Sequence, residues 1–192
     1  LHKKLNMYLS KICKTNTLND LRLFCLSLII SMVLLFVCSK NSIIYPMNGW
    51  TDEYIFFSVE DAMFNGRVLY KDIFEHKGPF LYLVIYGLAH YLGNCCFTIY
   101  FFECIANALF IFFGLKIILL YDKDATKIRM ILYALTMEVC LCTANAFMYG
   151  GTVEELYLWT SSYGLFVTLH CLKKDQYFSY KQIVLFGLLC LC

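Results

Sequence analysis

The chain has 192 residues, of which 60% are hydrophobic and 18% aromatic, and its formal net charge is only +2. This composition excludes disordered and fibrous classes and is typical of an integral membrane protein. The small net charge gives no indication of nucleic-acid binding. Most of the eleven cysteines lie within apolar runs, where they act as small hydrophobic side chains, and no metal-binding Cys pair is present.

The first predicted elements are a basic arm over residues 1–20 and an apolar run over 21–38. The run is long enough to cross a bilayer and too long for a signal-peptide core. The lysines of the arm predict that it faces the cytoplasm, because basic residues gather on that side. Residues 21–192 are then the N-terminal part of a transmembrane domain, and residues 39–96 form its first outer loop.

Within this loop the spacing predicts an amphipathic helix that lies along the membrane surface. Thr51 can cap the helix, Asp52 and Glu53 occupy its first turn, and Gly66 can end it. The two acids are candidates for a catalytic site. A purely structural role, in which they complement the helix dipole, explains them as well.

The second feature of the loop is the sequence His76-Lys77-Gly78-Pro79. Proline suits the first turn of a helix, and a lysine just before it adds a cation beside unpaired backbone N–H groups. Lys77, assisted by His76, is therefore a candidate phosphate-binding site, although an interfacial lysine needs no ligand. The apolar stretch over 79–93 is short for a span, so we place it at the outer surface.

Three further spans are predicted over about 97–120, 130–148 and 156–172, with an incomplete fifth over 183–192. The chain is expected to continue beyond this last run. The second outer loop ends in two acids: Thr152 and Glu155 fit a capping box, whereas Glu154 has no such explanation and is the better site candidate.

Three polar side chains fall inside the predicted spans: Glu103, Asn107 and Glu138. Ionisable groups within a membrane mark functional sites by default, yet polar contacts also hold helices together. The sequence leaves both roles open.

The loop motifs, taken together, resemble the N-terminal part of GT-C fold glycosyltransferases of the family 39 type, which includes aminoarabinose transferases and protein O-mannosyltransferases. The resemblance covers about residues 21–172, and its matching positions are Asp52-Glu53, Gly66, Leu69-Tyr70, Asp72 and Lys77-Gly78-Pro79-Phe80-Leu81-Tyr82. Two departures stand out. Gly78-Pro79 replaces the usual paired proline, and a family arginine of the next span is missing, with Glu103 nearby.

The resemblance implies an all-α integral membrane protein with a multi-span bundle and amphipathic juxtamembrane helices. It also implies an inverting transfer of a sugar from a polyprenyl-phosphate donor to a lipid, glycan or protein acceptor, outside the bacterial cytoplasmic membrane. Asp52 matches the first-loop acid and would act as general base or orient the acceptor, and Glu53 beside it is the second catalytic candidate. Lys77 matches the donor-phosphate lysine, and Glu154 or Glu155 matches the second-loop acid. No metal ligand set is recognised, and the sequence leaves open whether Mg²⁺ or Mn²⁺ assists.

Two other functions are compatible with the sequence. A transporter or flippase of a lipid-linked saccharide would use the intramembrane acids Glu103 and Glu138. A membrane assembly subunit without chemistry would tolerate replacement of Asp52 and Lys77. Fold analogy alone does not decide between these functions.

Overall fold

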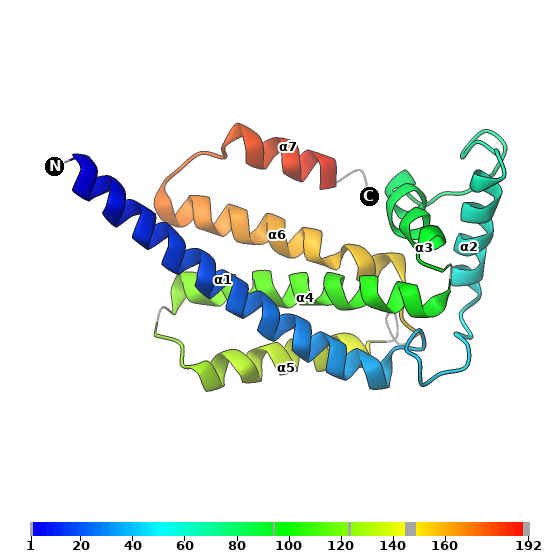
Figure 1. The fold of residues 1–192 in the computed structure, drawn as a ribbon, viewed down its shortest axis with the longest axis horizontal. Coiled ribbons are helices and arrows are strands. Elements are labelled where there is room, and N and C mark those ends of the chain that lie inside the picture. Colours follow the sequence, from blue (N-terminus) through cyan, green and yellow to red (C-terminus); the bar gives the residue numbers. More distant parts are fainter. Residues whose placement is uncertain (1, 94, 123, 145–148, 190–192) are drawn as a thin grey trace.

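The computed structural model describes residues 2–93, 95–122, 124–144 and 149–189, with side chains from residue 19 to residue 188. The predicted α-helical class is confirmed, since 74% of the chain is helical and the described residues form no strand. Figure 1 shows long helices side by side, with two short helices across one end.

The long helices are α1 (His2–Cys38), α4 (Cys96–Tyr121), α5 (Lys127–Thr143) and α6 (Val153–Lys174), followed by the shorter α7 (Tyr180–Leu189). Successive long helices run in alternating directions, and α4 packs against α1, α5 and α6 (Figure 1). The apolar surface of α4 is therefore covered from three directions, which makes it the central helix of the bundle.

Two of the described helical segments are long and apolar enough to cross a membrane, Asn19–Cys38 and Cys96–Tyr121. They coincide with the predicted spans over 21–38 and 97–120. The other predicted spans are also helical, but α5 has 17 residues, α7 has 10 and α6 is more polar. Residues 145–148 and 190–192, which belong to two of those predictions, lie outside the described residues.

The alternating helix directions bring basic residues of α5 and α6 to the same end of the bundle. Lys127 and Arg129 begin α5 and Lys173 and Lys174 end α6, so all four lie at one end, called here the basic end. Arg129 Nη1 lies 2.9 Å from Asp122 Oδ2 there. The opposite end, called the loop end, holds the C-terminus of α1 and the N-termini of α4 and α6 (Figure 1).

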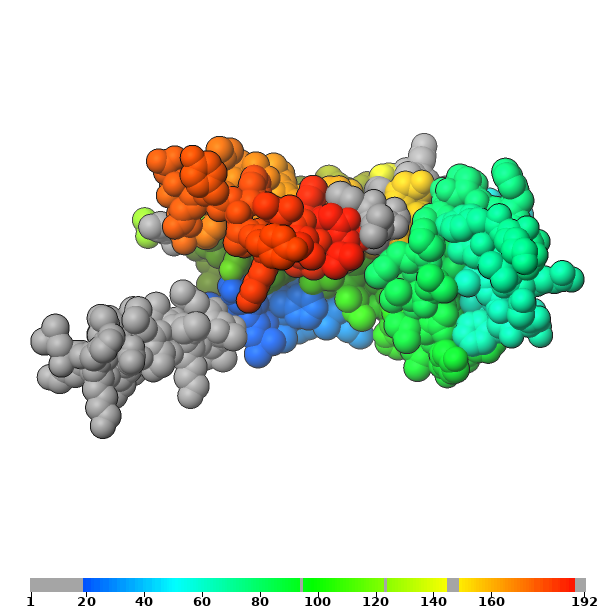
Figure 2. All heavy atoms as spheres, turned by 90° about the horizontal axis from the view of Figure 1, so that it is seen from above, coloured from blue at the N-terminus to red at the C-terminus, as the bar shows by residue number. Residues whose placement is uncertain are grey.

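A small domain-like cap covers the loop end. It consists of α2 (Thr51–Phe64), a π-helix η1 (Leu81–Tyr86) and α3 (Gly87–Tyr91). Figure 2 shows it as a separate block beside the long helices. The stretch over 79–93 lies in this cap and does not run along the bundle. His90 Nδ1 lies 2.6 Å from Glu60 Oε1 and thereby links α3 to α2.

The start of α2 differs from the expectation in one detail. Thr51 is the first helical residue, and the capping position before it, Trp50, makes no side-chain capping hydrogen bond. The Trp50 N–H instead donates to Asn48 Oδ1 at 3.0 Å. The helix ends at Phe64, and Gly66 follows with a φ of +87°, as the turn requires.

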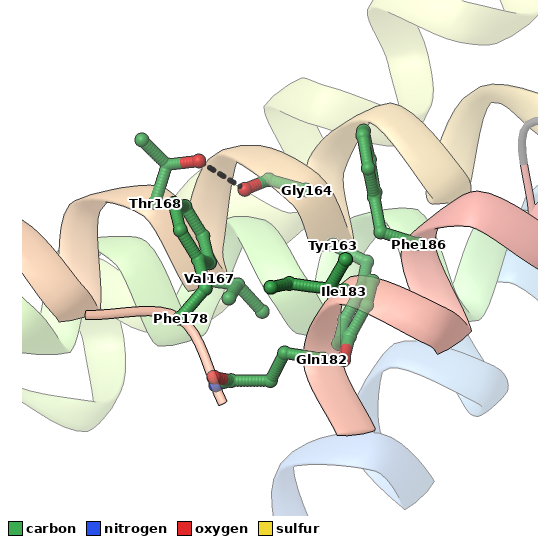
Figure 3. Close-up of a pocket in the computed structure, with 8 residues that line it drawn as sticks. All are labelled: Tyr163, Gly164, Val167, Thr168, Phe178, Gln182, Ile183 and Phe186. Atoms are coloured by element: carbon green, nitrogen blue, oxygen red, sulfur yellow. Dashed lines mark hydrogen bonds between the residues drawn. The ribbon is translucent and has the colours of Figure 1, made fainter. Parts of the chain in front are cut away.

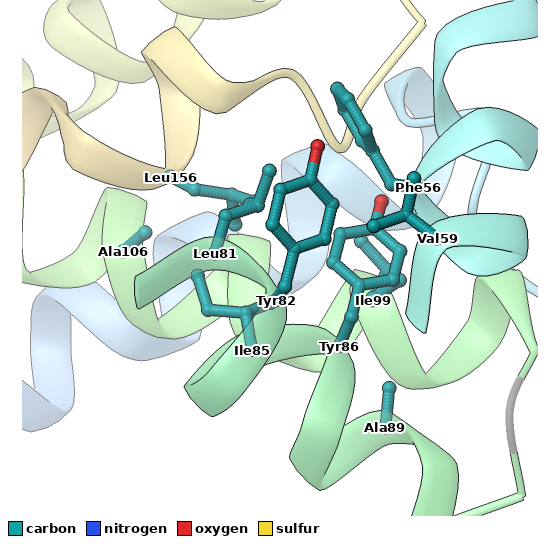
Figure 4. Close-up of a cluster of buried hydrophobic side chains, with 10 residues drawn as sticks. All are labelled: Phe56, Val59, Leu81, Tyr82, Ile85, Tyr86, Ala89, Ile99, Ala106 and Leu156. Atoms are coloured by element: carbon teal, nitrogen blue, oxygen red, sulfur yellow. The ribbon is translucent and has the colours of Figure 1, made fainter. Parts of the chain in front are cut away.

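An aromatic core joins the cap to α4 and α6 (Figure 4). Phe56 of α2 is 2% exposed, and its ring centroid lies 6.0 Å from that of Tyr82 and 5.6 Å from that of Tyr86. Both pairs are edge-to-face, the arrangement that aromatic quadrupoles favour. Ile99 of α4 and Leu156 of α6 complete the contact from the bundle.

Replacing Phe56 with alanine is expected to destabilise the protein by about 3–5 kcal/mol, because the deletion leaves a cavity between α2 and η1. The measurement is thermal unfolding of the purified chain in detergent. Phe74→Ala is the matched control, since Phe74 is 99% exposed and its loss should leave the melting temperature unchanged. Equal melting temperatures for the two variants would contradict the role of Phe56 as the anchor of the cap.

Candidate functional site

Four glutamates are buried where the cap meets the bundle. Glu53, Glu103 and Glu138 are 0% exposed and Glu155 is 1% exposed, and we call these four the carboxylate cluster. They come from α2, α4, α5 and α6 respectively. None of them forms an ion pair with a described Lys, Arg or His side chain. Burying carboxylates without cations is costly, so their stability depends on hydrogen bonds and on protonation.

The loop after α1 supplies the donors for Glu103. Ser39 Oγ donates to Glu103 Oε2 at 2.6 Å, and Asn41 Nδ2 donates to Glu103 Oε1 at 2.5 Å. Asn48 Nδ2 in turn donates to Asn41 Oδ1 at 2.8 Å and to the Tyr149 carbonyl at 3.1 Å. These bonds tie the loop that precedes α2 to both α4 and the second loop.

Asn107 bridges two further members of the cluster. Its Nδ2 donates to Glu155 Oε1 at 3.0 Å and reaches Glu138 Oε1 at 3.4 Å. Ser31 Oγ of α1 lies 3.3 Å from Glu138 Oε2. Asn107 and Glu138 therefore share a hydrogen-bonded network with Glu155 inside the bundle. Glu103 joins this network through the Gly151 backbone, which faces both Glu103 and Glu155.

The turn Gly150-Gly151 closes over the cluster in a conformation that favours glycine, with φ values of +78° and +70°. A Cβ atom on Gly150 would lie 2.4 Å from Ser39 Oγ and 2.9 Å from Glu103 Oε1. A Cβ atom on Gly151 would lie 2.8 Å from Asn41 Nδ2 and 3.1 Å from Glu53 Oε1. Two glycines are therefore needed for the backbone to approach the carboxylates this closely.

The two acids at the start of α2 face different environments. Asp52 is exposed, whereas Glu53 points into the cluster. Burial, together with the nearby carboxylate of Glu103, raises the pKa of Glu53 from its ordinary value of 4.5 to about 8. Asn41 and Cys96 are among the polar neighbours that partly offset this rise.

The two acids in the first turn of α6 also differ in their exposure to solvent. Thr152 caps the helix, because its Oγ1 accepts a hydrogen bond from the Glu155 N–H at 3.2 Å. The Glu155 side chain is held by Asn107 within the cluster. Glu154 is exposed and its Oε1 lies 3.7 Å from Lys77 Nζ. This ion pair connects the loop that follows α2 to the start of α6.

The backbone around Lys77 is fixed by its own loop. Glu75 Oε1 accepts hydrogen bonds from the N–H groups of His76 and Lys77, at 2.7 and 3.2 Å, and Tyr70 donates its hydroxyl to the Lys77 carbonyl. The side chain of His76 is 76% exposed and its Nδ1 lies 2.9 Å from Glu75 Oε1.

The structure thus divides the candidate residues into two sites. Lys77 and Glu154 meet at the surface, while Glu53 and Glu155 enter the buried cluster. Asp52 and His76 remain exposed near the loop end without a described partner from the other loop. The sequence interpretation missed Ser39, Asn41 and Asn48, because a buried loop asparagine has the same local signature as an ordinary turn asparagine.

Two further observations limit the chemistry of the site. Among the described residues, no group of three or more His, Cys, Asp or Glu side chains is arranged to hold a metal ion. The cavity drawn in Figure 3, of about 240 Å³, lies elsewhere, between α6 and α7. Its lining carries no carboxylate and consists of Tyr163, Gly164, Val167, Thr168, Phe178, Gln182, Ile183 and Phe186.

Comparison with protein-family models, with curated proteins and with solved structures gave no match.

The buried position of Glu53 predicts a pH-dependent stability. The folded protein keeps this proton up to about pH 8, whereas an unfolded chain loses it near pH 4.5. Between these values the folded state binds more protons, so stability falls as pH rises, by a few kcal/mol in all. Glu53→Gln should remove much of this dependence in thermal melts across the same range. If the melting temperature of Glu53→Gln changes with pH as much as that of the wild type, groups other than Glu53 cause the pH dependence.

Proposed function

We propose that the chain is part of a multi-span membrane glycosyltransferase that transfers a sugar from a polyprenyl-phosphate donor to an acceptor outside the cytoplasmic membrane. The observation that supports this most is the meeting of Lys77 from the first loop with Glu154 from the second. The two segments are far apart in the sequence, and each was identified as part of the site from its residues alone. The resemblance to GT-C enzymes of the family 39 type supplies the reaction.

Lys77 has the properties of a phosphate-binding residue. Its side chain is 24% exposed, so a ligand at the surface can reach the ammonium group. Glu154, its present partner, is 62% exposed, and such an ion pair contributes at most about 1 kcal/mol. A phosphate that carries more charge can replace the carboxylate at little cost. Lys77 would then stabilise the negative charge that develops on the leaving phosphate.

Asp52 is the acid available to an acceptor from solvent. Its carboxylate lies in the first turn of α2, exposed at the loop end of the bundle. In the proposed reaction Asp52 takes the proton of the acceptor hydroxyl while the oxygen attacks the sugar carbon. The bond from that carbon to the phosphate oxygen breaks on the opposite face, which inverts the configuration. Glu53 cannot take this role directly, because its carboxylate is buried.

The charge distribution supports an outward orientation of the site. The basic end carries Lys127, Arg129, Lys173 and Lys174, and the candidate site lies at the opposite end. Basic residues concentrate on the cytoplasmic side of membrane proteins, so the loop end would face outward. The apolar cavity between α6 and α7 would accommodate part of the polyprenyl chain, since Tyr163 lies ten residues, or about 15 Å, along α6 from its first residue.

A transporter of a lipid-linked saccharide is the second candidate, and the carboxylate cluster favours it. Glu103, Glu138 and Glu155 extend from the loop end into the interior of the bundle, where ionisable groups commonly mark a transport path. A surface site and an interior network thus favour different functions, and a direct assay is needed to decide between them.

The assay supplies membranes that contain the full chain with a radiolabelled polyprenyl-phosphate sugar and measures sugar transfer. Lys77→Ala is expected to reduce transfer about 10²-fold or more, because charge stabilisation in the transition state is lost. Asp52→Asn is expected to reduce it by a similar factor, because the general base is lost. Lys71→Ala, an exposed lysine of the same loop, is the control and should transfer normally.

The outcomes separate the candidate functions. Wild-type turnover by Asp52→Asn would rule out Asp52 as the base. Labelled lipid that changes leaflet without losing its sugar would favour the transporter. If the wild type neither transfers sugar nor moves the labelled lipid over a panel of donors, an assembly subunit becomes the better explanation.

The ion pair itself gives an independent prediction. Glu154→Gln removes the competitor of the phosphate for Lys77, so the KM for the donor should fall by up to about fivefold, with kcat nearly unchanged. The effect should shrink as salt concentration rises, since the pair is exposed. A large fall in kcat instead would make Glu154 a catalytic acid or base and contradict its role as a simple counter-ion.

A further inference from the structure

The carboxylate cluster contains more hydrogen-bond acceptors than donors. Three of its buried oxygen atoms make no hydrogen bond of good geometry to a described residue: both carboxylate oxygens of Glu53 and Oε2 of Glu155. The same holds for Oδ1 of the neighbouring Asn107. The orientation of the Asn107 amide is fixed, because its Nδ2 serves Glu138 and Glu155. The cluster therefore lacks hydrogen-bond donors that carry positive charge. A bound cation would supply what is missing.

The candidates for this cation are limited by the side chains that surround the cluster. The titratable groups that act on it electrostatically are its own members and uncharged thiols or phenols from η1, α4, α5 and the start of α2, namely Tyr54, Tyr86, Cys96, Tyr100, Cys104 and Cys142. Lys40, on the loop beside the cluster, directs its ammonium to the ring of Tyr45, 3.8 Å from the centroid. No described trio of acids has the arrangement of a metal site. The cation that suits the carboxylate cluster is therefore a proton and not a metal ion.

The backbone of Gly151 indicates where protons would be bound in the cluster. Its backbone N–H faces the carboxylates of both Glu103 and Glu155, and its Cα lies against Glu53. Two ionised carboxylates directed at one N–H group repel each other strongly in a medium of low dielectric constant. Such a pair binds one proton between its members and titrates as a unit.

We propose that the carboxylate cluster is a proton-binding site, in which Glu103 and Glu155 share one proton beside Gly151 and Glu53 carries a second. Glu53 is the member contributed by the cap, so its proton removes the repulsion between α2 and Glu103 and holds the cap on the bundle. When the pH outside rises, the O–H bond of Glu53 dissociates, the proton passes to water, and the carboxylate left behind weakens the contact.

The consequence for catalysis rests on the proposed function, whereas proton binding does not. Asp52 lies next to Glu53 on α2, so loosening of the cap would displace the proposed base together with the helix. Transfer activity would then fall at high pH.

Infrared spectroscopy of the purified full chain in lipid vesicles tests the site, because the carbonyl stretch of a protonated carboxyl is absent from a carboxylate. At neutral pH the wild type should show this band, and the band should decrease as the pH is raised past about 8. Glu53→Gln and Glu155→Gln should each remove a different part of it. Asp61→Asn, an exposed acid on the same helix α2, is the matched control and should leave it unchanged.

The attachment of the cap can be followed by the native cysteines. Cys96 lies beside Glu53 and is half-buried, while the adjacent Cys95 is exposed. The ratio of Cys96 to Cys95 alkylation, measured by mass spectrometry of the labelled peptides, is compared between the wild type and Glu53→Gln at each pH, because the two thiols differ in burial. This ratio should increase severalfold above about pH 8 in the wild type and stay low in Glu53→Gln.

Several results would overturn the proposal. A wild-type protein without the carboxyl band at neutral pH would show that the cluster is ionised, and a band lost on addition of Na⁺ or Ca²⁺ alone would identify a metal-ion site. A band that survives in both Glu53→Gln and Glu155→Gln would come from other acids. These measurements need no sugar donor, so a protein that shows the band yet transfers no sugar would contradict the proposed function and leave the proton site in place.

Discussion

The burial of four carboxyl groups without a cation among the described side chains is the constraint on which the loop end depends. Each group needs donors or a proton, and the loop after α1 provides donors although it is otherwise irregular. The loop after α1 turns inward so that Ser39 and Asn41 reach Glu103. The turn before α6 uses two glycines because any side chain there would occupy the space of the carboxylates. The positions of α2 and α6 follow from these contacts.

Two consecutive acids lie in the first turn of α2, and two more lie in the first turn of α6. In both helices one acid of the pair is exposed and the other is buried. Successive residues of an α-helix point about 100° apart, so one acid of each pair turns outward and the next turns inward. Asp52 and Glu154 thereby lie at the surface, and Glu53 and Glu155 lie in the cluster. The surface site and the buried network therefore share the same two helix starts.

Much of the fold could be predicted from local patterns, whereas the cluster could not. The long helices, the amphipathic α2 and the Thr152 cap follow from periodicity and end signals that a single segment carries. Which acid of each pair is buried depends on partners far away in the sequence, such as the Asn107 that holds Glu155 from 48 residues away. Glu103 is likewise held by Ser39, 64 residues away. The π-helix over Leu81–Tyr86 was likewise unexpected, because its residues have no distinct propensity of their own.

The π-helix also gives the cap two unlike faces. Leu81 and Tyr86 are completely buried in the aromatic core, while Leu83 is 63% exposed and Tyr91 of the following turn is 77% exposed. Apolar and aromatic side chains at such a position are solvated by lipid headgroups and upper acyl chains better than by water. The cap thus combines a buried face that anchors it to the bundle with an exposed apolar face of the kind that suits a membrane interface.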